Sequence, residues 1–174
     1  MAKRVELRRH TAADGDVLTP EGVQHALAVG STQDRGYDLA VSSGAQRATQ
    51  TLACILAGSG TRVPGGVVVD ARFKSEVEDR WRAAYDSAGA GDLAPFLRVD
   101  SELVENEAVL LGRALRECFD GLPEGGSALV VGHSPMHEVA VYGLTGDVVE
   151  PLSKGAGIVV TEEDGDYRVE PVHG

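Results

Sequence analysis

Apolar residues occur along the chain in two alternating patterns, as short runs and as positions three or four residues apart. The short runs predict strands, and they cover residues 5–9, 37–41, 67–69, 127–132, 158–161 and 167–169. The helical spacing predicts helices, and it covers residues 19–30, 45–58, 76–85, 101–120 and 135–144. Strands that alternate with helices predict an α/β protein, a three-layer α/β/α sandwich whose central sheet is mostly parallel.

Three of these elements carry clear local signals. Thr19 is a good N-cap and Pro20 is tolerated at the first helical position, so we expect a helix to begin there. The strand at 127–132 is almost wholly apolar, which is typical of a strand covered on both faces. The valines at 67–69 likewise predict a short buried strand. The length and the lack of linkers or repeats predict a single domain over residues 1–174.

Composition and charge limit the classes of partner that the protein is expected to bind. The 174 residues include 16 Lys and Arg and 27 Asp and Glu, so the net charge is −11. We expect no nucleic-acid partner, because the densest basic run, residues 3–9, is too short to form a basic stripe. We expect no membrane partner and a cytoplasmic protein, because no run approaches the ~20 apolar residues that span a bilayer and no apolar signal core follows the N-terminus. Cys54 and Cys118 fall on apolar positions of predicted helices, which predicts buried, reduced thiols.

Polar side chains stand where three predicted strands end. They are Arg9 and His10 after the first strand, Ser42, Ser43 and then Arg47 after the second, and His133 and Ser134 after the strand at 127–132. Ligands of open α/β sheets bind at the carboxyl ends of the strands, so we expect two imidazoles and two guanidinium groups to converge there. Guanidinium groups bind phosphate oxygens bidentately, and a neutral imidazole can attack phosphorus. The pattern therefore favours a phosphoryl ligand, held by a local cationic pocket in an acidic protein.

Four separated blocks of the sequence resemble the histidine phosphatase (phosphoglycerate-mutase-like) superfamily. They are Leu7–Thr11 (LRRHT), Leu18–Gly22 (LTPEG), Val41–Thr51 (VSSGAQRATQT) and Val131–Ser134 (VGHS). The blocks occur in the order of the family and lie within residues 5–145. The compact chain is most similar to the small phosphohistidine phosphatase subgroup. The resemblance implies a histidine-phosphatase-like fold and chemistry that needs no cofactor and no metal.

The resemblance also implies a role for each residue at the strand ends. His10 would be the nucleophile that is transiently phosphorylated. Arg9 and Arg47 would clamp the phosphoryl oxygens, and His133 would donate a hydrogen bond to the same group. The helix that begins near Pro135 would add its N-terminal dipole and its free N–H groups.

The sequence departs from the family pattern at two places in these blocks. Thr11 stands where the family usually has glycine after Arg-His, and its β-branched side chain restricts the backbone and narrows the approach to His10. This change is expected to affect catalytic efficiency and not the fold. The hydroxyl groups of Thr11 and Ser134 are expected to contact the phosphoryl group. Ser43-Gly44 replaces the usual Ser-Pro, which is a milder change.

The proton donor of the family lies after the third strand, which here is the segment 70–79. Counting from Phe73, Glu76 is the first candidate and Glu78 the second, while a solvated acidic helix face is the alternative for either. If neither reaches the pocket, the enzyme would act on substrates whose leaving group needs little protonation, such as phosphohistidine. The variable segment at about 72–99 is expected to form a cap or lid over the pocket.

The predicted function is hydrolysis of a phosphomonoester or a phosphohistidine through a phosphohistidine intermediate. Mutases of the family carry a longer segment with an Asn after the first histidine, whereas only seven residues, Thr11–Val17, separate His10 from Leu18. Three alternatives stay open: phosphoglycerate-mutase-type transfer, a phospho-ligand binding or regulatory module with little turnover, and a metal-dependent hydrolase built on His133 and His137. The expected partner is a small phosphorylated substrate or a phosphohistidine protein, and the sequence does not fix the oligomeric state.

Overall fold

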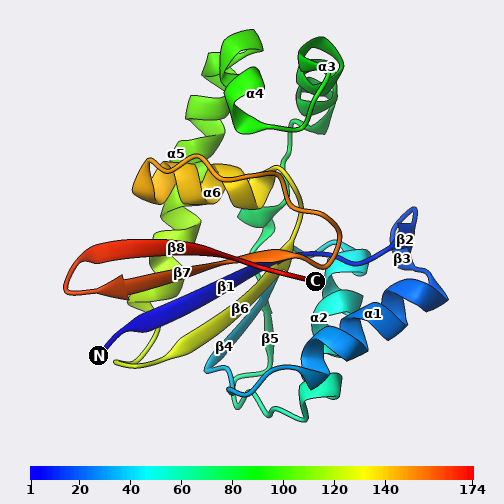
Figure 1. Ribbon diagram of the computed structural model, residues 1–174, viewed down its shortest axis with the longest axis vertical. Coiled ribbons are helices and arrows are strands. Elements are labelled where there is room, and N and C mark those ends of the chain that lie inside the picture. The colour runs from blue at the N-terminus through cyan, green and yellow to red at the C-terminus, as the bar shows by residue number, and fades with distance from the viewer.

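A six-stranded sheet forms the centre of the protein in the computed structural model, which describes residues 1–174 (Figure 1). Its strands are β1 (Lys3–Arg9), β4 (Leu39–Ser42), β5 (Val67–Val69), β6 (Ser127–Gly132), β7 (Gly157–Glu163) and β8 (Asp166–Val172). They lie in the order β5-β4-β6-β1-β7-β8, parallel from β5 to β1 and antiparallel at β7 and β8. A separate hairpin, β2 (Ala13–Asp14) and β3 (Val17–Leu18), follows β1.

Helices cover both faces of this sheet. They are α1 (Pro20–Ser31), α2 (Gln46–Ser59), α3 (Glu78–Ala88), α4 (Leu93–Val99), α5 (Ser101–Asp120) and α6 (Met136–Thr145), with a 3-10 turn, η1 (Ala71–Phe73), after β5. The pair α1 and α2 packs on one face, and the pair α5 and α6 packs on the other (Figure 1). The helices α3 and α4 stand beyond the sheet beside α5. The predicted three-layer α/β/α sandwich with a mostly parallel sheet is confirmed.

Strand alternation divides the core between the two layers. Val5 and Leu7 of β1 and Val130 of β6 face the layer of α5 and α6, whereas Leu129 and Val131 face the layer of α1 and α2. Every residue of β6 is buried, and complete burial of a Val or Leu side chain is worth about 1.5–3 kcal/mol. The position of the residues that follow β6 is therefore firmly set.

Polar residues of β1 point away from the α5–α6 layer. Glu6 and Arg8 are buried and form an ion pair at 3.1 Å, and the hydroxyl of Tyr37 donates to Glu6 at 2.5 Å. Arg8 also donates to the carbonyl oxygen of Gly155 at 2.9 Å. These contacts occupy the side chain of Arg8. Of the two adjacent arginines, only Arg9 is therefore available to bind a ligand at the end of β1.

The position of α2 depends on close packing against α1. As predicted, Thr19 caps α1, because its hydroxyl accepts from the backbone N–H of Gly22 at 3.0 Å, and Pro20 is the first helical residue. The two helices meet at Gly30, where a Cβ atom would lie 2.1 Å from the carbonyl oxygen of Ile55. Only glycine allows this approach, which fixes α2 and the first turn that carries part of the candidate site.

The structure corrects two expectations from the hydrophobic pattern. The valines of β5 are not buried but 44%, 47% and 59% exposed, because β5 is the edge strand of the sheet. The helix expected over 76–85 is α3, which begins and ends later, and the sequence analysis missed α4 altogether.

Neither cysteine forms a disulfide. Both are free thiols, as predicted, but only Cys118 is buried, whereas Cys54 is half-buried. Burial raises the pKa of the Cys118 thiol to about 12. None of the helices combines the length and the apolar character needed to cross a bilayer.

Candidate active site

The ends of two adjacent parallel strands bring two imidazoles together. β1 pairs with β6 so that Arg9 lies opposite Gly132, and the backbone N–H of His10 donates to the carbonyl oxygen of Gly132 at 3.0 Å. The next residue of each strand is therefore a histidine, His10 and His133, and their ring centroids are 5.5 Å apart. The two residues are only 8% and 7% exposed. They lie at the carboxyl end of the parallel sheet, where ligands bind in open α/β folds.

His10 presents one ring nitrogen to the pocket. Its Nδ1 lies 2.7 Å from the carbonyl oxygen of Thr11, and because a carbonyl only accepts, Nδ1 carries the proton. The lone pair of Nε2 is then available. Burial lowers the pKa of His10 to about 4, against the bond to Thr11 and with smaller contributions from Arg47 and Arg9. His10 is therefore a neutral imidazole at pH 7.

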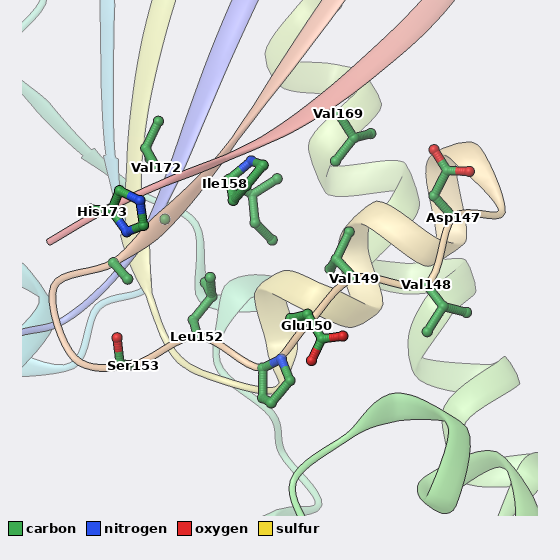
Figure 2. Close-up of a pocket in the computed structure, with 14 residues that line it drawn as sticks. Asp147, Val148, Val149, Glu150, Leu152, Ser153, Ile158, Val169, Val172 and His173 are labelled. Carbon is green, nitrogen blue, oxygen red and sulfur yellow. The ribbon is translucent and has the colours of Figure 1, made fainter.

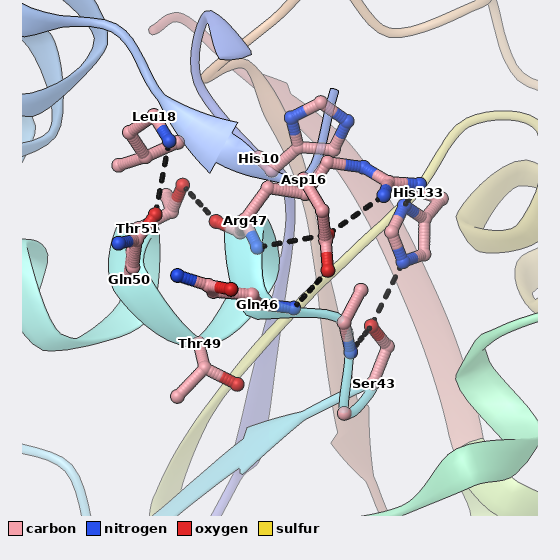
Figure 3. A network of polar contacts seen from close by, with 12 residues as sticks. His10, Asp16, Leu18, Ser43, Gln46, Arg47, Thr49, Gln50, Thr51 and His133 are labelled. Atoms are coloured by element: carbon pink, nitrogen blue, oxygen red, sulfur yellow. Dashed lines mark hydrogen bonds and ion pairs between the residues drawn. The ribbon is translucent and has the colours of Figure 1, made fainter. Parts of the chain in front are cut away.

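Arg47 stands in the first turn of α2 and is anchored by Asp16 from the β2–β3 hairpin (Figure 3). Asp16 accepts from Nη1 of Arg47 at 2.9 Å and from the backbone N–H groups of Gln46 and Arg47 at 3.1 and 3.2 Å. These bonds, above all the one from the Arg47 backbone, lower the pKa of Asp16. Nη2 of Arg47 lies 3.4 Å from Nδ1 of His133. One edge of the guanidinium is thus held while the other faces the imidazoles.

Arg9 reaches from the end of β1 to the loop that precedes β7. Its Nη1 donates to the carbonyl oxygen of Leu152 at 2.8 Å, and its buried Nε has no partner. Burial lowers the pKa of Arg9, and the nearby carboxylate of Glu138 opposes this effect. A partly desolvated guanidinium with an unpaired N–H is suited to bind an anion.

His133 is held by Ser43 at the end of β4. Its Nε2 lies 2.8 Å from the hydroxyl oxygen of Ser43 (Figure 3). A hydroxyl both donates and accepts, so Ser43 supports either tautomer of a neutral ring. Burial, followed by the charges of Arg47 and His10, lowers the pKa of His133 to about 3. His133 is therefore neutral, and because Arg47 only donates, its proton lies on Nε2 and is donated to Ser43. The ring can donate from Nδ1 to a bound oxygen once the proton moves to Nδ1 and Ser43 donates to Nε2 instead.

These four side chains line one cavity of about 260 Å³. Ser134, together with Pro135 and Met136 at the start of α6, forms part of the wall. Lys74, Glu78 and Trp81 form another part, so residues of the 72–99 segment border the cavity. The structure thus gathers the predicted His10, Arg9, Arg47, His133 and Ser134 around one space.

The two carboxylates considered as proton donor lie in different places. Both are exposed and both line a neighbouring hollow formed by residues 74–80, but only Glu78 also borders the cavity that holds the two histidines. The reason is local, because α3 begins at Glu78 and Val77 before it is not helical. The placement reverses the order of preference that the sequence suggested and favours Glu78 over Glu76.

Thr11 does not line the cavity, since its side chain is fully buried. Its hydroxyl donates to the carbonyl oxygen of Gly22 at 2.8 Å, and its backbone N–H donates to the hydroxyl of Thr51 at 3.2 Å. The structure corrects the expectation that this hydroxyl contacts a phosphoryl group, because it ties the end of β1 to α1 and α2. What Thr11 supplies to the site is the backbone carbonyl that orients His10.

Glu138 is a residue of this region that the sequence analysis missed. It lies in the first turn of α6, is 2% exposed, and accepts a hydrogen bond from the hydroxyl of Ser134. Burial raises the pKa of Glu138 to about 7, against the bond from Ser134 and smaller effects of the nearby backbone N–H groups of Glu138 and Leu152. An acidic residue in a first helical turn is typical of a solvated position near the helix dipole. The available signal was weak: Glu138 lies in the first turn of the helix that follows the His133-Ser134 strand end, four residues after Ser134.

His137 does not line the cavity either. It is fully buried, its Nε2 lies 2.9 Å from the carbonyl oxygen of Arg8, and burial lowers its pKa to about 4. Its ring packs so closely on Gly132 that a Cβ there would lie 3.0 Å from it. No group of three or more His, Cys, Asp and Glu side chains is arranged to hold a metal ion. His137 therefore supports the ends of β1 and β6. Its spacing of four residues from His133, which suggested a metal site, has this structural role instead.

A second cavity, of about 550 Å³, lies between the loop after α6 and strands β7 and β8 (Figure 2). Its lining includes Val149, Ile158 and Val169. Figure 2 shows His173 and Asp147 at opposite ends of it, with no titratable pair facing one another. This cavity is larger than the one at the strand ends, but the convergent imidazole and guanidinium groups lie in the smaller one.

The arrangement of strands and helices matches solved structures over nearly the whole chain. The phosphoglycerate mutase of Bacillus anthracis str. Sterne matches with a TM-score of 0.73 at 17% identity, over 98% of this chain and 92% of that one. The chain has a phosphoglycerate-mutase-like fold.

Two phosphatases show the same fold. The mycobacterial glucosyl-3-phosphoglycerate phosphatase matches with a TM-score of 0.70 at 18% identity, over 99% of both chains. The protein histidine phosphatase SixA, in complex with tungstate, matches with a TM-score of 0.64 at 20% identity, over 97% of this chain and 96% of that one. No protein-family model matches the sequence, and no curated protein matches it either.

Proposed function

We propose that the protein is a metal-independent phosphatase that hydrolyses a phosphomonoester or a phosphohistidine through transient phosphorylation of His10. The observation that carries this proposal is a pair of neutral imidazoles, 5.5 Å apart, in one cavity with two guanidinium groups. The guanidinium groups supply fixed positive charge while the imidazole stays an uncharged nucleophile. A protein of net charge −11 can bind an anion here because its cations are concentrated in a partly buried pocket.

In the first step, Nε2 of His10 attacks phosphorus in line with the leaving oxygen or nitrogen. The bond from phosphorus to Nε2 forms as the bond to the leaving group breaks, and the leaving group takes a proton from Glu78. Arg9, Arg47 and His133 donate hydrogen bonds to the equatorial oxygens, on which negative charge lies in the transition state. The cations are already in place, so little reorganisation accompanies the reaction.

In the second step, water attacks the phosphorus of phosphorylated His10. Glu78, now a carboxylate, accepts a proton from the water, and the electron pair of the phosphorus–nitrogen bond returns to Nε2. Inorganic phosphate leaves, and Glu78 is again protonated for the next cycle. The carbonyl of Thr11 keeps the proton on Nδ1 in both steps, so the same nitrogen is presented each time.

The leaving group would lie toward the 72–99 segment, which we assign as the cap. Lys74, Glu78 and Trp81 of this segment border the cavity. Trp81 is buried, donates from Nε1 to Glu107 at 3.1 Å and meets the ring of Phe96 edge-on at 5.4 Å. Trp81 is therefore a fixed wall, and the exposed Lys74 and Glu78 are the groups that can interact with the leaving group.

Hydrolysis is favoured over mutase-type transfer by the segment between His10 and Leu18. Its seven residues form the small β2–β3 hairpin, and the side chain of Asp16 on this hairpin binds Arg47. The segment therefore supports the catalytic machinery instead of extending toward a second substrate group. The fold itself does not choose, because it is shared by a phosphoglycerate mutase and by phosphatases.

Hydrolysis assays on the purified full chain test this proposal. The substrates are an aryl phosphate, sugar phosphates, nucleotides and a phosphohistidine peptide, each with and without a chelator. The expected result is phosphate release that survives chelation, is lost in His10→Ala and is kept in the matched control His173→Ala, an exposed histidine outside the cavity. Hydrolysis by His10→Ala at the parent rate contradicts the nucleophile, and loss of activity on chelation contradicts metal independence.

A further inference from the structure

Glu138 is a buried carboxylate that the two catalytic steps do not use. One oxygen, Oε2, accepts the hydroxyl proton of Ser134, a residue that borders the cavity. The other, Oε1, is buried and has no partner. An ionised carboxylate needs partners for both oxygens, and an unpaired oxygen in an apolar surrounding raises the free energy of the folded protein. The protein itself therefore leaves this carboxylate incompletely satisfied.

Two elements bring polar groups to this carboxylate. Arg9, at the end of β1, is the charged group that acts on Glu138, and each alters the pKa of the other. The loop before β7 contributes the backbone N–H of Leu152. The same loop carries Lys154, an exposed cation whose charge acts on His10.

The remaining neighbours of Glu138 add no charge. On its own helix, His137 is adjacent in sequence, but its Nε2 is bound to the Arg8 carbonyl and its burial keeps the ring neutral. The helix α5 packs against α6 through small residues, since Ala108 and Gly112 touch the backbone of Gly143. Arg9 is thus the cation that acts most directly on the carboxylate.

Arg9 also belongs to the group proposed to bind the phosphoryl oxygens. A bound dianion and the Glu138 carboxylate would then share one cation within a partly buried site. Two anions beside one cation repel each other, and proton binding by one of them relieves the repulsion. Phosphoryl binding and the protonation of Glu138 are therefore coupled by their common neighbour.

We propose that Glu138 is a positioning residue that takes up a proton when a phosphoryl dianion binds, an inference that rests on the function proposed above. In the empty cavity the ionised carboxylate balances Arg9 and holds the hydroxyl proton of Ser134. On binding, one proton from solvent adds to the carboxylate, and the neutral carboxyl group donates to Oγ of Ser134. The Ser134 hydroxyl is thereby released to donate to a phosphoryl oxygen.

The titration ranges of the pocket groups make this coupling measurable. Burial raises the pKa of Glu138 to about 7, so its protonation state is adjustable near neutral pH. The pKa values of His10 and His133, about 4 and about 3, lie well below this range. Sulfate is a suitable probe because it is a tetrahedral dianion that does not itself exchange protons near neutral pH.

Calorimetric titration of the full chain with sulfate at about pH 8, in buffers of different ionisation enthalpy, counts the protons taken up per sulfate bound. The expected result is that the wild-type protein takes up at least about half a proton more than Glu138→Gln, which keeps the shape and is always neutral. Glu163→Gln, which changes an exposed carboxylate at the end of β7, should match the wild-type protein.

Equal proton uptake by the wild-type protein and Glu138→Gln overturns the inference, and a wild-type protein that binds no sulfate overturns it together with the proposed pocket. If Glu138→Gln does not fold, the pH dependence of sulfate binding by the wild-type protein decides. The Kd for sulfate should rise between about pH 7.5 and 8.5, with a limit of about tenfold per pH unit, and a constant Kd overturns the inference. Proton-linked sulfate binding without hydrolysis of any substrate would contradict the proposed function and support this inference.

Discussion

Nδ1 of His10 lies 2.7 Å from the backbone carbonyl oxygen of Thr11, so a main-chain group decides which ring nitrogen faces the cavity. A carbonyl oxygen is present whatever side chain follows His10. The replacement of the usual glycine by Thr11 therefore leaves this contact intact, and the threonine side chain is accommodated away from the cavity, between β1, α1 and α2.

Thr11→Val tests the assignment of this hydroxyl to the interior. Valine has nearly the same shape but removes the hydrogen bond that the Thr11 hydroxyl donates to the Gly22 carbonyl, which is expected to cost about 0.5–1.5 kcal/mol of stability. The Thr51 hydroxyl keeps its bonds to the Thr11 N–H and the Arg47 carbonyl. The KM for an aryl phosphate should stay within about twofold, because the hydroxyl does not contact substrate. Chemical denaturation and steady-state kinetics measure the two effects. An unchanged stability with a raised KM would instead place the hydroxyl in the substrate site.

The exchange of Glu78 and Glu76 for glutamine separates the two candidate proton donors. Glu78→Gln should lower kcat on alkyl phosphates by about 10²–10⁴-fold, and less on aryl phosphates, whose leaving groups need little protonation. Glu76→Gln is the matched control, because it removes an equal charge two residues away and outside the cavity. The ratio of kcat on the two substrate types measures the effect. A larger loss in Glu76→Gln would return the role to that residue.

Substitution of Asp16 tests whether this residue positions Arg47. Arg47→Ala should lower kcat/KM by about 10²–10³-fold, the usual effect of losing one donor to transition-state charge. Asp16→Ala should lower it less, by about tenfold, and cost about 1 kcal/mol of stability, because Asp16 also caps α2. Asp14→Ala changes an exposed residue of the same hairpin and serves as the control. A gain in activity for Asp16→Ala would mean that its carboxylate competes with substrate for Arg47.

The buried histidines predict how stability depends on pH. Burial lowers the pKa values of His10, His133 and His137 to about 4, 3 and 4, so between these values and about 6.5 the unfolded chain binds more protons than the folded one. As pH falls from 7 toward 5, each of the three therefore lowers the free energy of unfolding by up to about 1.4 kcal/mol per pH unit.

Glu138 acts in the opposite direction over the same interval. Its pKa in the folded protein is raised to about 7, so the folded protein binds the additional proton and gains stability as pH falls. The net expectation is a loss of stability toward pH 5 that is steeper in Glu138→Gln than in the wild-type protein. Urea unfolding across this interval measures both slopes. Equal slopes would show that Glu138 has no raised pKa in the folded protein.

The strand-end residues were the part of the site that the sequence could predict. His10 and His133 each follow a strand with a strong apolar signal, and parallel strands place their carboxyl ends at one edge of the sheet. Local pattern and sheet geometry together were sufficient for these positions. The three-layer fold could also be predicted, because strands and helices each show their own hydrophobic periodicity.

The residues that sequence could not place depend on contacts between distant segments. The choice between Glu76 and Glu78 depends on where α3 begins, and a shift of two residues decides which carboxylate borders the cavity. The burial of Glu138 depends on the loop before β7 closing over α6. The exposure of the β5 valines depends on the order of strands in the sheet, which three consecutive valines do not encode.

The most direct test of the whole account is to identify the phosphorylated residue during turnover. Rapid quenching of the reaction with an aryl phosphate, under alkaline conditions that preserve phosphohistidine, is followed by proteolysis and mass spectrometry of the peptides. The account predicts one phosphoryl group on His10, which forms within a single turnover and decays to inorganic phosphate no more slowly than kcat. Turnover with phosphate on no residue, or on His133 in place of His10, would contradict it.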